Sequence, residues 1–237
     1  MCEKKQILYT VMISFLSFMG LYFFMKAFPF NILQKKTFVI WVLAFVHASL
    51  ITILGADVIV HNFTHFNETN QEQQCILLAI SMGYFIHDMI HELIEFIDYL
   101  KKENNNKSIL KVMQYIIHHV LVLSFEIIVI KQGWGASELC FCLFIYEIST
   151  IFLAVRGALI DIGLKNHILT TLIEITWFIT FVIFRMILAP YILIYILFYT
   201  RFNEKGIFLK ILVLSFHCLN MYWLWLAIQK LMKKFFK

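Results

Sequence analysis

Residues that interrupt a helix are scarce in this 237-residue chain, which contains two prolines and eight glycines. It has no Ser/Gly-rich linker and no low-complexity tract, which excludes a string of domains joined by flexible segments. No basic patch interleaved with aromatic residues occurs, so nucleic acid is not an expected partner. The five cysteines show no zinc-binding spacing, and we interpret them as structural: Cys2, Cys75, Cys140, Cys142 and Cys218.

Apolar residues, in contrast, make up 61% of the chain, and the mean hydropathy is +0.81. A helix needs roughly 20 residues to cross about 30 Å of hydrocarbon. Seven runs fit this length: residues 7–25, 38–60, 76–98, 112–130, 136–155, 168–198 and 207–229. The sixth is overlong, and we expect a kink, a tilt or a partial re-entrant turn near Pro190 to absorb the excess. The sequence predicts an all-α membrane protein of about seven transmembrane helices.

The distribution of Lys and Arg predicts the orientation, because these residues are enriched in cytosolic loops. One face of the membrane receives thirteen: Lys26, Lys35, Lys36, Lys101, Lys102, Lys107, Lys111, Arg156, Lys165, Lys230, Lys233, Lys234 and Lys237. The other receives six: Lys4, Lys5, Lys131, Arg201, Lys205 and Lys210. We therefore expect the first face, with the C-terminus, to be cytosolic, while Lys4 and Lys5 also fit a signal anchor and leave the orientation of the first helix open.

The loop over residues 61–75 supports the same orientation. It contains no Lys or Arg and falls on the lumenal side. Two glycosylation sequons lie in this loop, Asn62-Phe63-Thr64 and Asn67-Glu68-Thr69. Glycosylation takes place on lumenal segments, so the sequons and the basic residues are independent indications of one topology.

Two consecutive histidines, His118 and His119, lie inside one of the apolar runs. Polar side chains are costly in hydrocarbon unless they face a protein interior or a water-filled cavity. Neighbouring helical residues point about 100° apart, so both imidazoles can face inward only toward a cavity. Helix rise places them at a depth similar to that of His47 and Glu147, which predicts a shared polar layer.

Other polar residues form stripes on the same helices. Tyr115, His119 and Glu126 share one face of the fourth run. Glu174 and Arg185 return to nearly the same face of the sixth run, and we interpret them as a structural ion pair or a headgroup contact. Arg156 points away from Glu147, and we expect it to end the fifth helix at the cytosolic headgroups.

Several of these residues belong to short motifs that follow one another along the chain. They are His47, Gly83-Tyr84-Phe85 with Asp88, His118-His119, and Glu147-Ile148-Ser149-Thr150 with Phe152 and Arg156. In this order and spacing they resemble the TLC domain, the membrane module of translocating-chain-associating proteins, Lag-type ceramide synthases and their relatives. The resemblance covers residues 35–232, leaving an N-terminal helix and cytosolic loop over 1–34 and a basic tail over 233–237. It is closest to the TLC-domain-containing branch, near its fourth type.

The resemblance implies six helices in a barrel around a central cavity, residence in the endoplasmic reticulum or a related membrane, and a role in lipid homeostasis. The protein would bind or act on a lipid acyl chain in a cavity lined by His118 and His119. Candidate catalytic residues are His118, His119 and Glu147. Candidate cavity-lining or lipid-binding residues are His47, Tyr84, Asp88, Tyr115, Glu126, Thr150 and Arg185. Membrane lipid is the expected partner, no metal or other cofactor is expected, and a homo-oligomer stays open.

Four alternatives remain. In ceramide synthases two aspartates follow the histidine pair, and the matching positions here are Glu147 and Thr150, so an N-acyltransferase that uses acyl-CoA would have lost one carboxylate. The pair could instead be a structural polar cluster. A translocon-associated protein is a third alternative. A di-iron hydroxylase is a fourth, but the topology separates His61 and His65 from the other histidines by about 20 Å.

Overall fold

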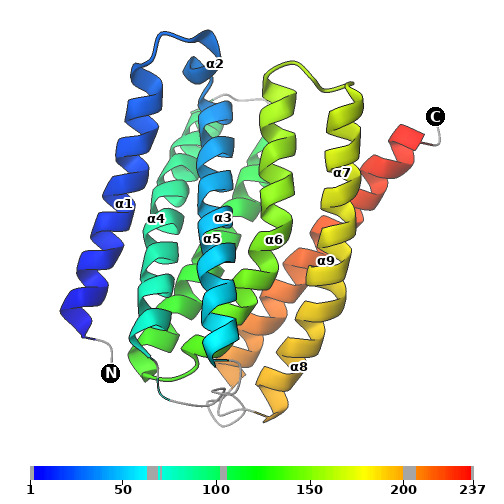
Figure 1. Ribbon diagram of the computed structural model, residues 1–237. Helices are drawn as coiled ribbons and strands as arrows, with labels where there is room; N and C mark the ends of the chain where they lie inside the picture. Colours follow the sequence, from blue (N-terminus) through cyan, green and yellow to red (C-terminus); the bar gives the residue numbers. More distant parts are fainter. Residues whose placement is uncertain (1–2, 63–68, 70, 102–105, 200–206, 236–237) are drawn as a thin grey trace.

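We describe the protein from a computed structural model, in which residues 3–62, 69, 71–101, 106–199 and 207–235 are described. The regular elements of these segments are helical: α1 (Lys4–Ala27), α2 (Asn31–Gln34), α3 (Lys36–Asn62), α4 (Glu72–Lys101), α5 (Asn106–Gln132), α6 (Ala136–Asp161), α7 (Ile168–Thr180), η1 (Phe181–Leu188), α8 (Ala189–Tyr199) and α9 (Ile207–Phe235). The described segments contain seven helical stretches long and apolar enough to cross a membrane, which confirms the predicted spans (Figure 1).

The long helices run up and down between two ends of the bundle. We call the end with Ala27, Lys36 and Asp161 the upper end, and the end with Lys4, Glu72 and Ala136 the lower end (Figure 1). At the lower end, α5 and α6 are joined by a short turn in which Gly133 (φ 74°) and Gly135 (φ 88°) adopt the left-handed conformation that favours glycine. The two sequons, at residues 62–64 and 67–69, lie largely outside the described residues.

The overlong sixth span contains a π-helical segment. Residues Phe181–Leu188 form η1 between α7 and α8, and Pro190 is the second residue of α8. Proline has no backbone N–H to donate and crowds the preceding turn, and a wider π turn relieves this conflict without breaking the helix. The segment crosses the bundle as one rod without turning back (Figure 1).

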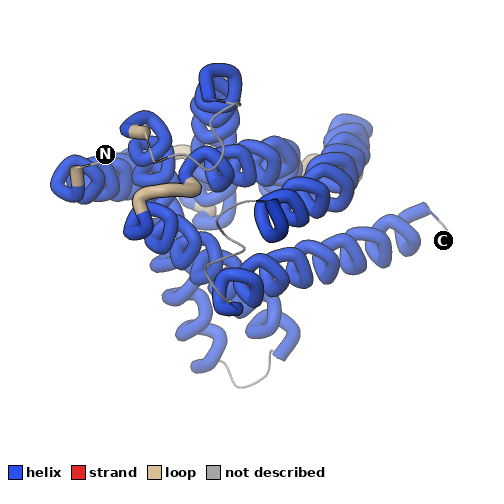
Figure 2. Tube along the Cα trace, turned by 90° about the horizontal axis from the view of Figure 1, so that it is seen from below, coloured by secondary structure: helices blue, strands red, loops and turns tan. Residues whose placement is uncertain are grey.

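The helices form a ring whose interior is partly closed, because α6 also packs against helices on the opposite side. Neighbours make contact in the order α3, α4, α5, α9, the η1–α8 segment, α6 and back to α3, and α7 also packs on α6. Viewed along the bundle, α9 crosses the others obliquely (Figure 2). α6 also touches α4 and α5 across the ring, so the interior between α3, α4 and α6 is filled by side chains. α1 lies outside the ring, against α4 (Figure 1).

Candidate functional site

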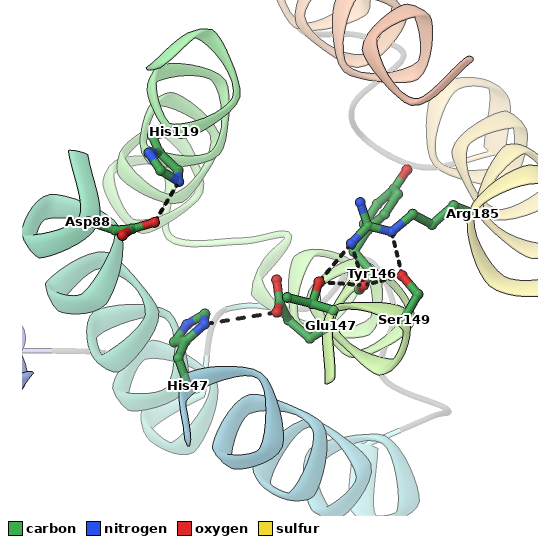
Figure 3. Close-up of polar contacts among 8 residues, drawn as sticks. His47, Asp88, His119, Tyr146, Glu147, Ser149 and Arg185 are labelled. Atoms are coloured by element: carbon green, nitrogen blue, oxygen red, sulfur yellow. Dashed lines mark hydrogen bonds and ion pairs between the residues drawn. The ribbon is translucent and has the colours of Figure 1, made fainter. Parts of the chain in front are cut away.

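His119 forms an ion-pair contact with Asp88 in the core of the bundle. Its Nε2 atom lies 3.3 Å from Oδ2 of Asp88, which extends from α4 (Figure 3). The histidine side chain is 4% exposed, so the pair is shielded from competing solvent. A carboxylate in this position fixes which imidazole nitrogen carries the proton and orients the ring. The sequence placed both residues in the site, and the structure brings them together.

A second carboxylate and imidazole approach one another between α3 and α6. Nδ1 of His47 lies 3.9 Å from Oε2 of Glu147, and both side chains are buried (Figure 3). The His47 ring stacks on Tyr84, with 3.8 Å between ring centroids and 11° between their planes. Three predicted site residues from three helices therefore form one cluster.

His118 points in a different direction from its neighbour. Its ring packs near Phe216 and Trp223 of α9, at centroid distances of 5.4 and 5.2 Å. The two imidazole centroids are 5.5 Å apart, but His119 faces α4. Consecutive residues of a helix point about 100° apart, so His119 lies at the interface with α4 and His118 at the interface with α9. Tyr115, one turn earlier than His119, is half-buried and also lies by Trp223.

Arg185 is buried in the bundle and binds only neutral oxygen atoms among the described residues. Its Nε donates to Ser149 Oγ at 2.8 Å, and its Nη2 donates to Thr150 Oγ1 at 2.8 Å and to the backbone oxygen of Tyr146 at 2.7 Å. Its Nη1 donates to Oδ1 of Asn220 at 3.3 Å. Figure 3 shows Arg185 and His47 approaching α6 from opposite sides. Thr150, which replaces a carboxylate of the ceramide-synthase pattern, therefore serves as an acceptor for this arginine.

The predicted ion pair between Glu174 and Arg185 is wrong. Glu174 instead accepts from Nε of Arg156 at 3.0 Å and lies 2.9 Å from its Nη2. The prediction assumed an uninterrupted α-helix, whereas η1 widens the turns just before Arg185 and rotates it to a different face. Arg156 is corrected as well: α6 continues to Asp161, and Arg156 faces α7 rather than the headgroups.

Glu126 lies deep in the core, on the same helix as the histidine pair. Its side chain is 0% exposed, and neither carboxylate oxygen accepts a hydrogen bond from the described chain. The Ser81 hydroxyl of α4 is the polar group beside it. Glu126 and His119 were predicted to share a face, and both are buried in the bundle.

An apolar cavity of about 60 Å³ opens between α5, α6, α8 and α9. Its walls are mainly aliphatic and aromatic: Val122, Phe125, Val129, Glu138, Leu139, Cys142, Leu143, Tyr146, Leu193, Val213 and Phe216. Neither His118 nor His119 lines this cavity. His118 is one helical turn above Val122 and touches Phe216, so it lies just beyond the upper end of the wall. The other predicted lining residues also lie outside the cavity wall.

Tyr146 and Asn220 were not among the site residues that the sequence predicted. Tyr146 connects the polar residues to the cavity, because its ring lines the cavity and lies 5.3 Å from the Arg185 guanidinium carbon. Asn220 is 0% exposed and also donates to the Phe216 oxygen. An asparagine in an apolar span could have indicated the role of Asn220, because such side chains form hydrogen bonds between membrane helices.

Histidine and cysteine side chains also occur elsewhere in the described helices. No group of three or more His, Cys, Asp or Glu side chains in them is arranged to hold a metal ion. Cys140, Cys142 and Cys218 are free thiols, whereas Cys75 is disulfide-bonded. His87 and His91 lie together on α4, with centroids 4.7 Å apart, and His91 packs near Tyr22 of α1.

Comparison with known proteins identifies the fold. The family model of the TLC domain matches residues 37–229. No curated protein sequence matches the chain. The matched region contains the polar cluster of α3, α4, α5 and α6, the buried arginine and the cavity, and leaves α1 outside. The chain therefore belongs to the TLC-domain family of membrane proteins.

Proposed function

We propose that this protein handles membrane lipid by holding an acyl chain in the cavity between α5, α6, α8 and α9, as part of lipid homeostasis. The cavity carries this proposal, because apolar side chains form its walls inside a membrane bundle. A buried water needs a cavity of roughly 10–15 Å³. The cavity here is about 60 Å³, which is enough for a segment of one hydrocarbon chain. The polar groups at its upper end, Arg185 with its acceptors and His118 behind Phe216, are placed to meet the head of such a lipid.

Filling the cavity tests the proposal. Val213 lines it, whereas the adjacent Leu214 is 62% exposed on the outside of α9. We expect Val213→Phe to reduce binding of a radiolabelled long-chain lipid to the purified protein, because the new ring occupies the space for the chain. Leu214→Phe adds the same ring to α9 outside the cavity and should leave binding unchanged. Equal binding by both variants would contradict an acyl chain in this cavity.

A ceramide-synthase-like N-acyltransferase is the second candidate function. The observation that favours it is the contact of His119 with Asp88, since an imidazole oriented by a carboxylate is suited to act as general base. The base would take the proton from an amine as its nitrogen attacks the carbonyl carbon of an acyl-CoA thioester, with the CoA thiolate as leaving group. His118 and Glu147 are the other candidate catalytic residues. The Thr150 hydroxyl, bound to Arg185, replaces one family carboxylate and weakens this assignment.

An acyl transfer assay decides between the two functions. Purified protein is incubated with palmitoyl-CoA and a sphingoid base, and the amide product is measured by mass spectrometry. If the protein is an enzyme, we expect the product to disappear in His119→Ala and to fall strongly in Asp88→Asn. His167 is exposed, so His167→Ala should still form product. Absence of product from the wild type, under conditions where a ceramide synthase is active, would remove the enzymatic candidate and leave lipid binding.

We infer further that the upper end of the bundle faces the cytosol of the endoplasmic reticulum or a related membrane. Thirteen of the basic residues fall on that side of the seven spans. Cys75, at the lower end, is disulfide-bonded, and disulfides persist in oxidising compartments such as the lumen. The sequons fall on the same lower side.

A further inference from the structure

Arg185 is a buried cation whose hydrogen-bond partners carry no formal charge. The residue is 6% exposed, and its four acceptors among the described residues are two hydroxyls, one amide oxygen and one backbone oxygen. Among the described residues, no carboxylate lies within 4.0 Å of its nitrogens. Glu147 directs its carboxylate to His47, with 3.9 Å between Oε2 and Nδ1, and interacts with the arginine electrostatically without forming an ion pair (Figure 3).

An unpaired cation at this depth is unusual in a membrane protein. Intramembrane arginines are costly and are normally paired or used to bind an ion or substrate. The bundle contains a direct comparison, because Arg156 pairs with Glu174 at 2.9 Å. Neutral oxygens and the rings of Tyr146 and Phe181, each 5.3 Å from the guanidinium carbon, replace the hydration of Arg185, but no described carboxylate pairs with it at contact distance. The geometry therefore favours an anionic ligand at Arg185 and none at Arg156.

The position of Arg185 beside the cavity defines the rest of this ligand. Its guanidinium carbon lies 5.3 Å from the ring centroid of Tyr146, which is part of the cavity wall. The cavity accommodates a segment of one chain, so a two-chain lipid is a poor fit. Guanidinium has five N–H groups, and these four hydrogen bonds leave one free, on Nη1. Asn220 occupies the other N–H of Nη1, so a ligand that displaces Asn220 finds two donors there, which matches the two oxygens of a carboxylate.

Resting on the proposed function, we propose that the ligand is a long-chain fatty acid, with its carboxylate bound by Arg185 and its chain in the cavity. Asn220 provides the place for the carboxylate. Its bond to Nη1, at 3.3 Å, is the longest of the four, and it also donates to the Phe216 oxygen at 2.9 Å. An incoming carboxylate therefore replaces this acceptor at the smallest cost and forms a charge-assisted hydrogen bond in a buried site.

The test compares ligands with one chain and different heads. Binding of radiolabelled palmitate and radiolabelled hexadecanol to purified protein is measured by scintillation proximity, with hexadecyl phosphate as a competing anion. We expect the wild type to bind palmitate at least about tenfold more tightly than hexadecanol, because a charge-assisted bond replaces a neutral one. Arg185→Gln should reduce this ratio to about one while hexadecanol binding stays the same.

A second variant keeps the arginine in place. Asn220→Asp retains the oxygen that faces Nη1 but supplies a fixed carboxylate, so palmitate should lose its advantage over hexadecanol even if Arg185→Gln fails to fold. Arg156→Gln is the matched control, because that arginine is already paired, and it should retain the palmitate preference.

The outcomes separate this inference from the function on which it rests. If palmitate and hexadecanol bind equally well to the wild type, the proposal that the cavity binds an acyl chain is retained, and the proposal that Arg185 binds a carboxylate is wrong. If Asn220→Asp retains the preference, or hexadecyl phosphate binds more tightly than palmitate, Arg185 is not a carboxylate site. If neither chain binds, the proposed function itself fails.

Discussion

Arg156 of α6 and Glu174 of α7 form a buried ion pair, with 2.9 Å between Nη2 and Oε1 and side chains that are 14% and 6% exposed. Lys230 of α9 approaches the same carboxylate oxygen at 3.6 Å from a largely exposed position. The contact joins three helices near the upper end of the bundle. It is the largest departure from the sequence prediction, in which each of the two paired residues had a different role.

Breaking this pair should destabilise the protein more than removing it completely. Arg156→Met leaves the Glu174 carboxylate buried without its arginine partner, and we expect a loss of about 2–3 kcal/mol in unfolding free energy. The double variant Arg156→Met/Glu174→Met should recover most of that loss. Unfolding can be followed through the reaction of a thiol-specific dye with Cys140 and Cys142, in a Cys218→Ser background. Equal destabilisation by single and double variants would show that the ion pair itself is the stabilising feature.

The close approach of α1 to α4 depends on Gly83. A Cβ at this position would lie 2.5 Å from Ser14 Cβ and 2.8 Å from the backbone nitrogen of Phe15. Gly83→Ala should therefore displace α1, break the bond from Ser14 Oγ to the Ile80 oxygen and cost about 1–3 kcal/mol. Gly20→Ala is the matched control on α1, because nothing lies within 4 Å of an added Cβ and alanine favours the helix. Thermal unfolding of the two variants compares them directly.

The spans could be predicted from the sequence because each depends on local properties, length and hydropathy, that the bilayer imposes on every helix. The inward-facing residues could be predicted for the same reason: Asp88, His119 and Glu147 are polar in apolar runs. Their partners could not. Whether Glu174 meets Arg156 or Arg185 depends on the register of the helix, and η1 changes that register in a way that hydropathy does not indicate.

The cavity between α5, α6, α8 and α9 is not lined by the histidines from which the sequence located one. The sequence located it by its polar residues, but a cavity in a membrane bundle depends on which helices fail to close over one another. α6 packs against α3 and, across the ring, against α4, and the space between these three helices is filled by Tyr84 and Phe85 of α4 and His47 of α3. The oblique α9 leaves space on the other side, between aliphatic side chains that look like ordinary core residues in the sequence.

The tight contact of α3 with α6 offers another test. A Cβ on Gly157 would collide with the indole ring of Trp41, so Gly157→Ala should destabilise the protein by about 1–3 kcal/mol. Trp41→Leu removes the colliding ring, and in that background Gly157→Ala should have a much smaller effect, because residues in contact are not additive. The same thiol-dye measurement applies. Additive losses in the double variant would mean that the indole moves aside in the wild type.

The inferred orientation predicts which loops can be labelled from the cytosol. Lys165 is exposed between α6 and α7 at the upper end, and Lys131 is exposed at the lower end of α5. In a Cys218→Ser background and sealed microsomes, Lys165→Cys should react with a membrane-impermeant maleimide, whereas Lys131→Cys should react only after the membrane is opened by detergent. Neither change alters the hydrophobic core, so both proteins should fold. Labelling of Lys131→Cys in sealed microsomes, with Lys165→Cys protected, would reverse the topology and place the upper end of the cavity, with Arg185, toward the lumenal leaflet.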